Sequence, residues 1–221
     1  MFDRGIETHG EATYGHPALI FPAYGNTVLK LGIVSDVHCN IVGLKRAVEM
    51  MGDIDELLCL GDSIYEYRFS NDVIRYLREV GAHVILGNHE EGFLSPSGIR
   101  AREAEWIDKS LLGWMAEQPH RRDLTFGNKK VLMVHSTPWE PRGAYVHPTS
   151  SLIKRFGEVD ADYVLYGHTH YQMAERVGKV LVINPGSAGD ARDSRNGRLL
   201  SFAVLDTATD NVAITDYADG A

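Results

Sequence analysis

Aspartate and histidine side chains occur at short spacings that suit metal binding. Asp36 and His38 follow an apolar run that starts near Val28 and is typical of a buried strand. On extended backbone, residues i and i+2 point to the same side, so the carboxylate and the imidazole are expected to face one space. This pair suits a borderline divalent metal such as Mn, Fe or Zn. Taken alone, however, it fits equally a helix-capping Asp beside a polar His at a strand end.

Further residues of the same chemistry follow in the chain. His168 and His170 repeat the i, i+2 spacing, which on extended backbone would again aim both side chains to one side. Each cluster has an ordinary alternative as turn residues or as a satisfied core histidine. All of them nevertheless follow predicted strands, at the carboxyl ends where sites form in open α/β sheets. The remaining members of this set are Asp62 after Gly61, Asn88 and His89 after Gly87, and His135.

The elements that must position these residues alternate in the first half of the chain. The apolar pattern predicts strands near 28–34, 57–60 and 82–86, with helices over 41–51 and 71–80 between them. Such alternation implies a parallel sheet with right-handed crossovers. A longer helix is expected over 101–117, closed by Pro119.

The second half of the chain has a different pattern. Gly127-Asn128 predicts a hairpin turn between strands 124–126 and 131–134. A helix near 150–156 and a strand over 163–166 follow, and antiparallel strands are expected over 172–177, 179–183, 199–206 and 212–216. We therefore expect one domain over residues 27–221, with two sheets covered by helices. Residues 1–26 have no clear period and are predicted to be an N-terminal extension without a catalytic group.

Composition narrows the class of protein. The chain has 221 residues, of which 44% are hydrophobic and 24% charged, as in an ordinary globular protein. It has no apolar run long enough for a membrane span and no signal-peptide pattern, and its two cysteines cannot form a disulfide framework. We expect a cytoplasmic protein. A net charge of −8 argues against an extended nucleic-acid surface. Homo-oligomer formation stays open.

The ordered set of motifs resembles the calcineurin-like metallophosphoesterases, in particular their small bacterial and archaeal phosphodiesterase-like branch. The resemblance extends from Leu31 to about Asp216. The motifs that carry it are Asp36-x-His38, Gly61-Asp62, Gly87-Asn88-His89-Glu90, His135, Gly167-His168-Thr169-His170 and Asn184-Pro185-Gly186-Ser187.

The resemblance implies an α/β (α+β) fold, a four-layer αββα sandwich of two mixed sheets, with a binuclear centre between loops. It also implies a role for each residue of the set. One divalent ion would be held by Asp36, His38 and His170, a second by Asn88, His135 and His168, with Asp62 as the bridge and His89 beside the substrate.

The chemistry of these residue types agrees with that implication. Two divalent ions with only two carboxylates leave residual positive charge, which attracts phosphate and stabilises its transition state. Such a pair can activate a hydroxide, and His89 is then the expected general acid for the leaving oxygen. The protein is expected to hydrolyse a phosphomonoester or a phosphodiester, a small phosphorylated substrate in either case.

Two other functions stay open at this point. One is a nuclease or nucleotidase on the same scaffold, and the other is a metal-binding scaffold without catalysis that binds proteins. The sequence has no G-x-S-x-G elbow, Walker loop or His-Glu-x-x-His helix to suggest different chemistry. Differences from the family pattern at Cys39, Ser63 and Ser136 leave the substrate open. Candidate substrate contacts are Arg142 and Tyr65, with Arg68, Trp139 and Tyr145 as further residues that could equally be surface or core.

Overall fold

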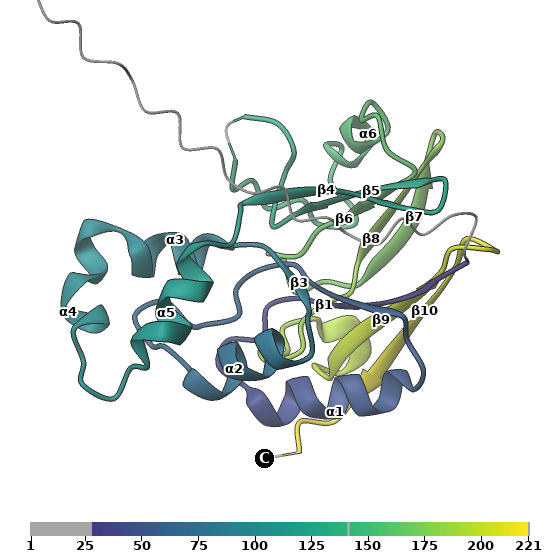
Figure 1. Cartoon of the computed structure of the whole chain (residues 1–221). Helices are drawn as coiled ribbons and strands as arrows, with labels where there is room; N and C mark the ends of the chain where they lie inside the picture. The colour runs from purple at the N-terminus through teal and green to yellow at the C-terminus, as the bar shows by residue number, and fades with distance from the viewer. Residues whose placement is uncertain (1–27, 141, 221) are drawn as a thin grey trace, which may run out of the picture.

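Two five-stranded sheets pack face to face in the computed structural model, which describes residues 28–140 and 142–220. The predicted extension 1–26 lies outside the described residues. The strand order is β10-β9-β1-β2-β3 in the first sheet and β4-β5-β6-β8-β7 in the second (Figure 1). The strands are β1 Lys30–Val34, β2 Glu56–Cys59, β3 His83–Val84, β4 Arg121–Phe126, β5 Lys129–Val134, β6 Tyr163–Leu165, β7 Met173–Val177, β8 Val180–Asn184, β9 Leu200–Asp206 and β10 Asn211–Tyr217.

Both sheets are mixed. β1, β2 and β3 are parallel, as the alternating pattern predicts, and β9 and β10 add an antiparallel edge. In the second sheet β5, β6 and β8 are parallel, while β4 and β7 pair antiparallel at the two edges. The hairpin around Gly127-Asn128 is confirmed, since β4 and β5 meet there with Phe126 opposite Lys129. β3 is shorter than the predicted strand 82–86.

The main core lies between the sheets. Because side chains alternate along a strand, Leu31 and Ile33 of β1 face the second sheet, whereas Val34 packs toward the helices. Met133 of β5 and Leu165 of β6 meet the first sheet from the other side. This apolar layer anchors β1, β2, β5 and β6, which are four of the five strands followed by candidate ligands.

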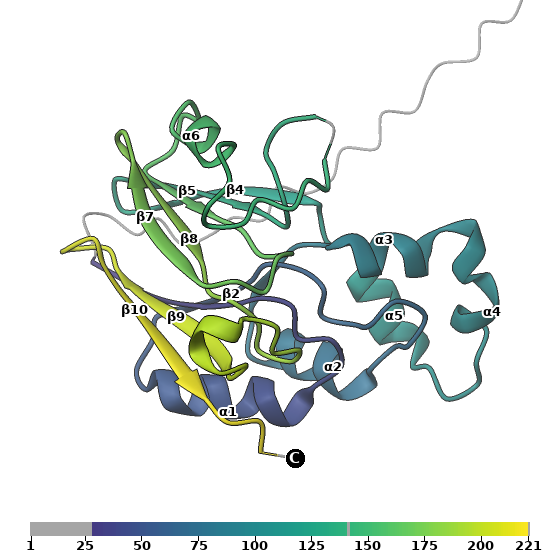
Figure 2. The same ribbon diagram turned by 180° about the vertical axis from the view of Figure 1, so that it is seen from behind.

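Helices cover both outer faces, which confirms the predicted four-layer αββα arrangement. α1 and α2 pack on the first sheet, and the short α6 packs on the second, while α3, α4 and α5 lie together at one end beside β3 (Figures 1 and 2). The helices are α1 Ile41–Met51, α2 Asn71–Glu79, α3 Asn88–Leu94, α4 Ile99–Arg102, α5 Lys109–Ala116 and α6 Ile153–Phe156, with 3₁₀ turns at Pro96–Gly98 and Ser194–Asn196.

One helix prediction was wrong, and one helix was missed. The single helix expected over 101–117 is broken into α4 and α5, because Asp108 caps a new helix by accepting hydrogen bonds from the backbone N–H groups of Ser110 and Leu111. Helix α3, which begins at Asn88, was not predicted at all. Within the described ranges, no helix is long and apolar enough to cross a membrane.

Candidate metal centre

The loops that follow β1, β2, β3, β5 and β6 converge at one edge of the sandwich and bring the predicted side chains together. Asp36 and His38 do face one space, as expected, but their backbone is not extended. Five of the residues have left-handed backbone instead, with positive φ between 48° and 67°. This conformation costs about 1 kcal/mol or more for a non-glycine residue and is concentrated at functional sites. The five residues are Asp36, His38, Asp62, His168 and His170.

Glycines let these loops approach one another closely. A Cβ on Gly87 would collide with the backbone nitrogen and the carboxylate of Asp62. A Cβ on Gly167 would collide with the side chain of Ser35 and lie 2.7 Å from Asp36 Oδ2. Gly87 and Gly167 are therefore required for steric reasons, because only a hydrogen atom fits where the two loops meet.

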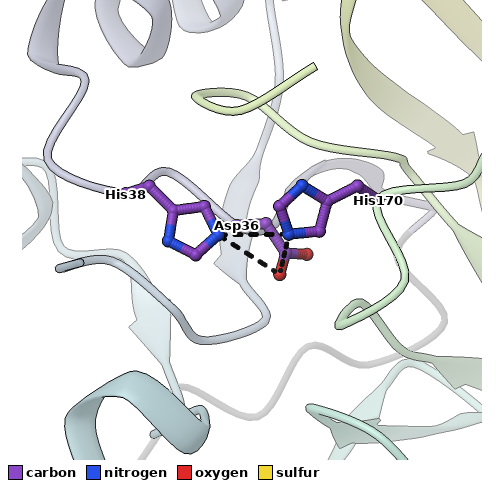
Figure 3. Close-up of side chains that lie close together, drawn as sticks. All are labelled: Asp36, His38 and His170. Atoms are coloured by element: carbon purple, nitrogen blue, oxygen red, sulfur yellow. Dashed lines mark hydrogen bonds and ion pairs between the residues drawn. The ribbon is translucent and has the colours of Figure 1, made fainter. Parts of the chain in front are cut away.

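The first group consists of Asp36, His38 and His170 (Figure 3). His170 Nε2 lies 3.1 Å from His38 Nε2 and 3.3 Å from Asp36 Oδ1, and His38 Nε2 lies 3.9 Å from that same oxygen. All three side chains are buried. Asp36 Oδ1 is also buried without a hydrogen-bond partner among the described residues, which is costly for a carboxylate oxygen unless a cation binds it.

The second group consists of Asn88, His135 and His168, around Asp62. His135 Nε2 lies 3.0 Å from Asn88 Oδ1, 3.2 Å from His168 Nδ1 and 3.2 Å from Asp62 Oδ2. Asp62 also has an oxygen within 4.8 Å of a nitrogen of His38, so its carboxylate lies between the two groups.

Hydrogen bonds to backbone carbonyls orient three of the histidines. Nδ1 of His170 contacts the carbonyl oxygen of Asp190 at 2.6 Å, and Nδ1 of His135 contacts that of Leu60 at 2.8 Å. Nε2 of His168 contacts the carbonyl of Gly143 at 3.2 Å. A carbonyl can only accept, so each of these nitrogens carries a proton, and the other nitrogen of each ring presents a lone pair to the site.

Acceptor atoms consequently face acceptor atoms across the centre. In the neutral ring, the lone pair of His135 Nε2 meets a carboxylate oxygen, an amide oxygen and the Nδ1 lone pair of His168, all at hydrogen-bond distance. Such a cluster repels itself unless a proton or a metal ion lies between its members. The donor set of imidazoles, carboxylates and one amide fits a borderline divalent ion.

The electrostatics of the buried groups point the same way. Burial lowers the pKa of His38 to about 4, and burial together with the charge of His135 lowers that of His168 to about 4, so both imidazoles are neutral at pH 7. Burial disfavours a charged His135 as well, but the Asp62 carboxylate outweighs it and raises the pKa to about 10. Although burial opposes ionisation of Asp36, the nearby His170 holds its pKa well below the ordinary value. The field at the centre therefore favours added positive charge.

Glu90 is a residue of the candidate site for which the sequence reasoning gave no role. It is buried, and its Oε1 accepts the backbone N–H groups of Ser63 and Ile64 at 2.6 and 3.2 Å. Its Oε2 accepts those of Asp62 and Gly87, both at 2.9 Å. Burial and the Asp62 charge raise the pKa of Glu90 to about 7 despite these donors. Glu90 thus fixes the Asp62 loop to the start of α3. Its place in the motif, two residues after a predicted ligand, was the available signal.

His89 lies beside the first group and is only partly exposed. Its Nδ1 accepts the backbone N–H of Glu66 at 2.7 Å, which leaves the proton of the neutral ring on Nε2. Nε2 lies 3.7 Å from Asp62 Oδ2, and the ring stacks on Tyr65 at 5.2 Å between centroids. Asn88 and His89 are the first two residues of α3, where successive side chains point in different directions.

The other predicted substrate contacts are distributed around the centre. Tyr65 is 37% exposed and packs its edge on His38, with the Arg68 guanidinium 5.3 Å from its ring. Tyr145 is 59% exposed and stacks on His168. Arg142 pairs with Glu91 at 3.0 Å on the same side as His168. Trp139, by contrast, packs against Phe156 in the core beneath the second sheet.

The comparison with known protein families decides how this geometry is interpreted. A family model described as the calcineurin-like phosphoesterase superfamily domain matches residues 29–210, which is most of the chain. The chain belongs to this family. The calcineurin-like phosphoesterases use divalent metals, and the described Asp and His groups are of the kind that bind them. This member is a hydrolase of phosphoric esters.

The chain is similar to several phosphoesterases from bacteria and archaea. Phosphodiesterase MJ0936 of Methanocaldococcus jannaschii is 25% identical over 166 residues, 72% of this chain and 83% of that protein. A symmetrical bis(5'-nucleosyl)-tetraphosphatase of Salmonella paratyphi A is 32% identical over 120 residues, 47% of this chain and 42% of that protein. The crystal structure of a metallophosphoesterase from Sphaerobacter thermophilus has the same fold, with a TM-score of 0.67 at 24% identity, covering 86% of this chain and 88% of that one.

Proposed function

We propose that this phosphoesterase hydrolyses a small phosphomonoester or phosphodiester at a centre of two divalent ions, which are Mn, Fe, Zn or a mixture. The observation that carries the proposal is the position of Asp62 between two ligand groups whose acceptor atoms face one another. Asp36, His38 and His170 would hold one ion, and Asn88, His135 and His168 the other. The lone pairs directed into both groups support this division.

The chain's own residues have distinct tasks in this proposal. When bound, the two ions would generate hydroxide from water near neutral pH and offset the charge of the phosphoryl oxygens. The carboxylate of Asp62 fixes the separation of the two groups, and Glu90 holds that carboxylate's loop against α3. His89, with its protonated Nε2 toward Asp62, donates a proton to the leaving oxygen.

A nucleotide substrate is the second candidate. One relative is a bis(5'-nucleosyl)-tetraphosphatase by name. The phosphates of a dinucleoside polyphosphate are joined by phosphoanhydride bonds, which hydroxide can cleave by the same attack on phosphorus as an ester. The net charge of −8 speaks against long duplex nucleic acid, which requires a basic surface. The complete set of ligand side chains speaks against a scaffold without catalysis. The cytoplasmic setting and the oligomeric state stay predictions.

Chelation is expected to abolish the activity. Because the proposed nucleophile and the charge compensation both depend on the ions, treatment with a strong chelator should remove turnover of p-nitrophenyl esters, and Mn, Fe or Zn should restore it. The measurement combines metal analysis with assays on a panel of phosphomonoesters, phosphodiesters and dinucleotides. A fully metallated protein that hydrolyses no member of this panel would contradict the proposal.

A further inference from the structure

A pocket with a volume of about 540 Å³ adjoins the candidate metal centre on the side of the second ligand group. Neither His89 nor Tyr65 is among the described residues that line this pocket. These two residues lie on the other side, beside His38. The residues that matter for the pocket's chemistry are Asn88, His135, His168, Glu91, His120 and Arg142.

Three segments of the chain fix the polar wall of this pocket. Glu91 of α3 pairs with Arg142 Nη1 and with His120 Nδ1, both at 3.0 Å and through the same carboxylate oxygen. Arg142 also lies 3.6 Å from the carboxylate of Glu140. The guanidinium of Arg142 is thus already offset by two carboxylates. The wall offers hydrogen bonds with little excess charge, which suits an uncharged polar group better than a second phosphate.

The position of the pocket relative to His89 indicates which part of a substrate enters it. In the proposed function, on which this inference rests, His89 protonates the leaving oxygen, so the leaving group extends toward Tyr65 and His38. A group that stays on phosphorus would then extend toward His168 and the pocket. A phosphomonoester that reacts as a substrate carries only its leaving group and would leave the pocket unused.

We propose that the pocket binds the retained group of a phosphodiester, and that this group is uncharged, polar and about the size of a nucleoside. In the reaction, the oxygen of hydroxide forms a bond to phosphorus while the bond from phosphorus to the leaving oxygen breaks. The electron pair of that bond stays on the leaving oxygen, which takes a proton from His89. The products are a free alcohol and the phosphomonoester of the retained group, which stays in the pocket until release.

Two diesters with the same leaving group test the proposal. Thymidine 5'-p-nitrophenyl phosphate and methyl p-nitrophenyl phosphate differ only in the retained group, and p-nitrophenolate departs with little need of a proton. One methylene group in an apolar pocket already changes kcat/KM by roughly 10–200-fold, so kcat/KM for the thymidine ester should exceed that for the methyl ester by at least about tenfold. The monoester p-nitrophenyl phosphate completes the series.

A substitution that fills the pocket should remove this preference. His120 has a 43% exposed side chain, so His120→Trp can occupy the pocket without disturbing the core. The matched control is Arg75→Trp on α2, where a 41% exposed side chain pairs with Asp72 away from the pocket. The ratio of the two kcat/KM values should fall toward one in His120→Trp and stay at the wild-type value in Arg75→Trp.

Calorimetry supplies a readout that does not depend on turnover. Thymidine 5'-monophosphate, the product with the retained group, should bind wild type and Arg75→Trp more tightly than inorganic phosphate, and this difference should vanish in His120→Trp. Equal kcat/KM for the two diesters in wild type, or an unchanged ratio in His120→Trp, would overturn the proposal. If none of the three esters is hydrolysed, the proposed function fails instead, and equal binding of the two phosphates would then overturn the pocket as well.

Discussion

Replacement of Asp62 by alanine is expected to lower the metal content of both positions and to remove turnover. The Asp62 carboxylate lies within reach of His38 in one group and of His135 in the other, so its loss removes negative charge from both. Two like charged ions that share no anion also repel each other strongly at a separation of about 4 Å. Metal analysis of purified variants measures the effect.

Two comparisons show whether the effect is specific to Asp62. His170→Ala and His135→Ala each remove a ligand from one group only, so each is expected to weaken mainly one ion. Asp193→Ala removes another buried carboxylate, which pairs with Arg195 and does not belong to either group, and should keep the wild-type metal content. Equal stoichiometry in Asp62→Ala and wild type would refute the bridging role.

The second large effect concerns His89. His89→Ala or His89→Asn should lower kcat by roughly 10²–10⁴-fold, which is the usual contribution of a general acid. The structure also groups His89 with His38 and Asp62, with ring nitrogens and a carboxylate oxygen within 4.8 Å of one another. The proposed ligand sets complete both ions without His89, so both metals should stay bound in the variants. The loss should be largest for alkyl leaving groups and should shrink for p-nitrophenolate, which leaves without protonation.

The leaving-group dependence separates two roles of the His89 imidazole. The neutral ring donates from Nε2 while Nδ1 accepts the Glu66 N–H at 2.7 Å, so it can also serve as a fixed hydrogen-bond donor to a phosphoryl oxygen. That role would give the same loss for every leaving group. Equal losses for alkyl and p-nitrophenyl esters, or loss of metal from the variant, would contradict proton donation by His89.

Much of this architecture could be predicted from the sequence because it depends on periodicity. The alternation of apolar strands and amphipathic helices predicted the parallel part of the first sheet, and Gly127-Asn128 predicted the hairpin of β4 and β5. Helix boundaries set by caps were harder. α1 starts at Ile41, as predicted, but its cap is Asn40, which accepts the N–H of Gly43, and not Asp36. The cap at Asp108 lies inside a stretch with good helix propensity.

The candidate centre was predictable in its members and not in its geometry. The end of a strand can be recognised from nearby residues alone, so Asp36 and His168 could be identified as candidate members of the centre. Their left-handed backbone depends on contacts between loops that are far apart in sequence, for example the hydrogen bond from His168 N to Asp36 Oδ2 at 3.1 Å. The same is true of Glu90, whose four backbone donors come from two loops, and of the pocket around Glu91.

Anomalous diffraction from crystals grown with manganese tests the two-metal centre most directly. Data collected on both sides of the manganese absorption edge locate each ion independently of activity. We expect two peaks that share Asp62, one bounded by Asp36, His38 and His170 and the other by Asn88, His135 and His168. A single peak, or two peaks of which one or neither contacts Asp62, would contradict a binuclear centre bridged by this carboxylate.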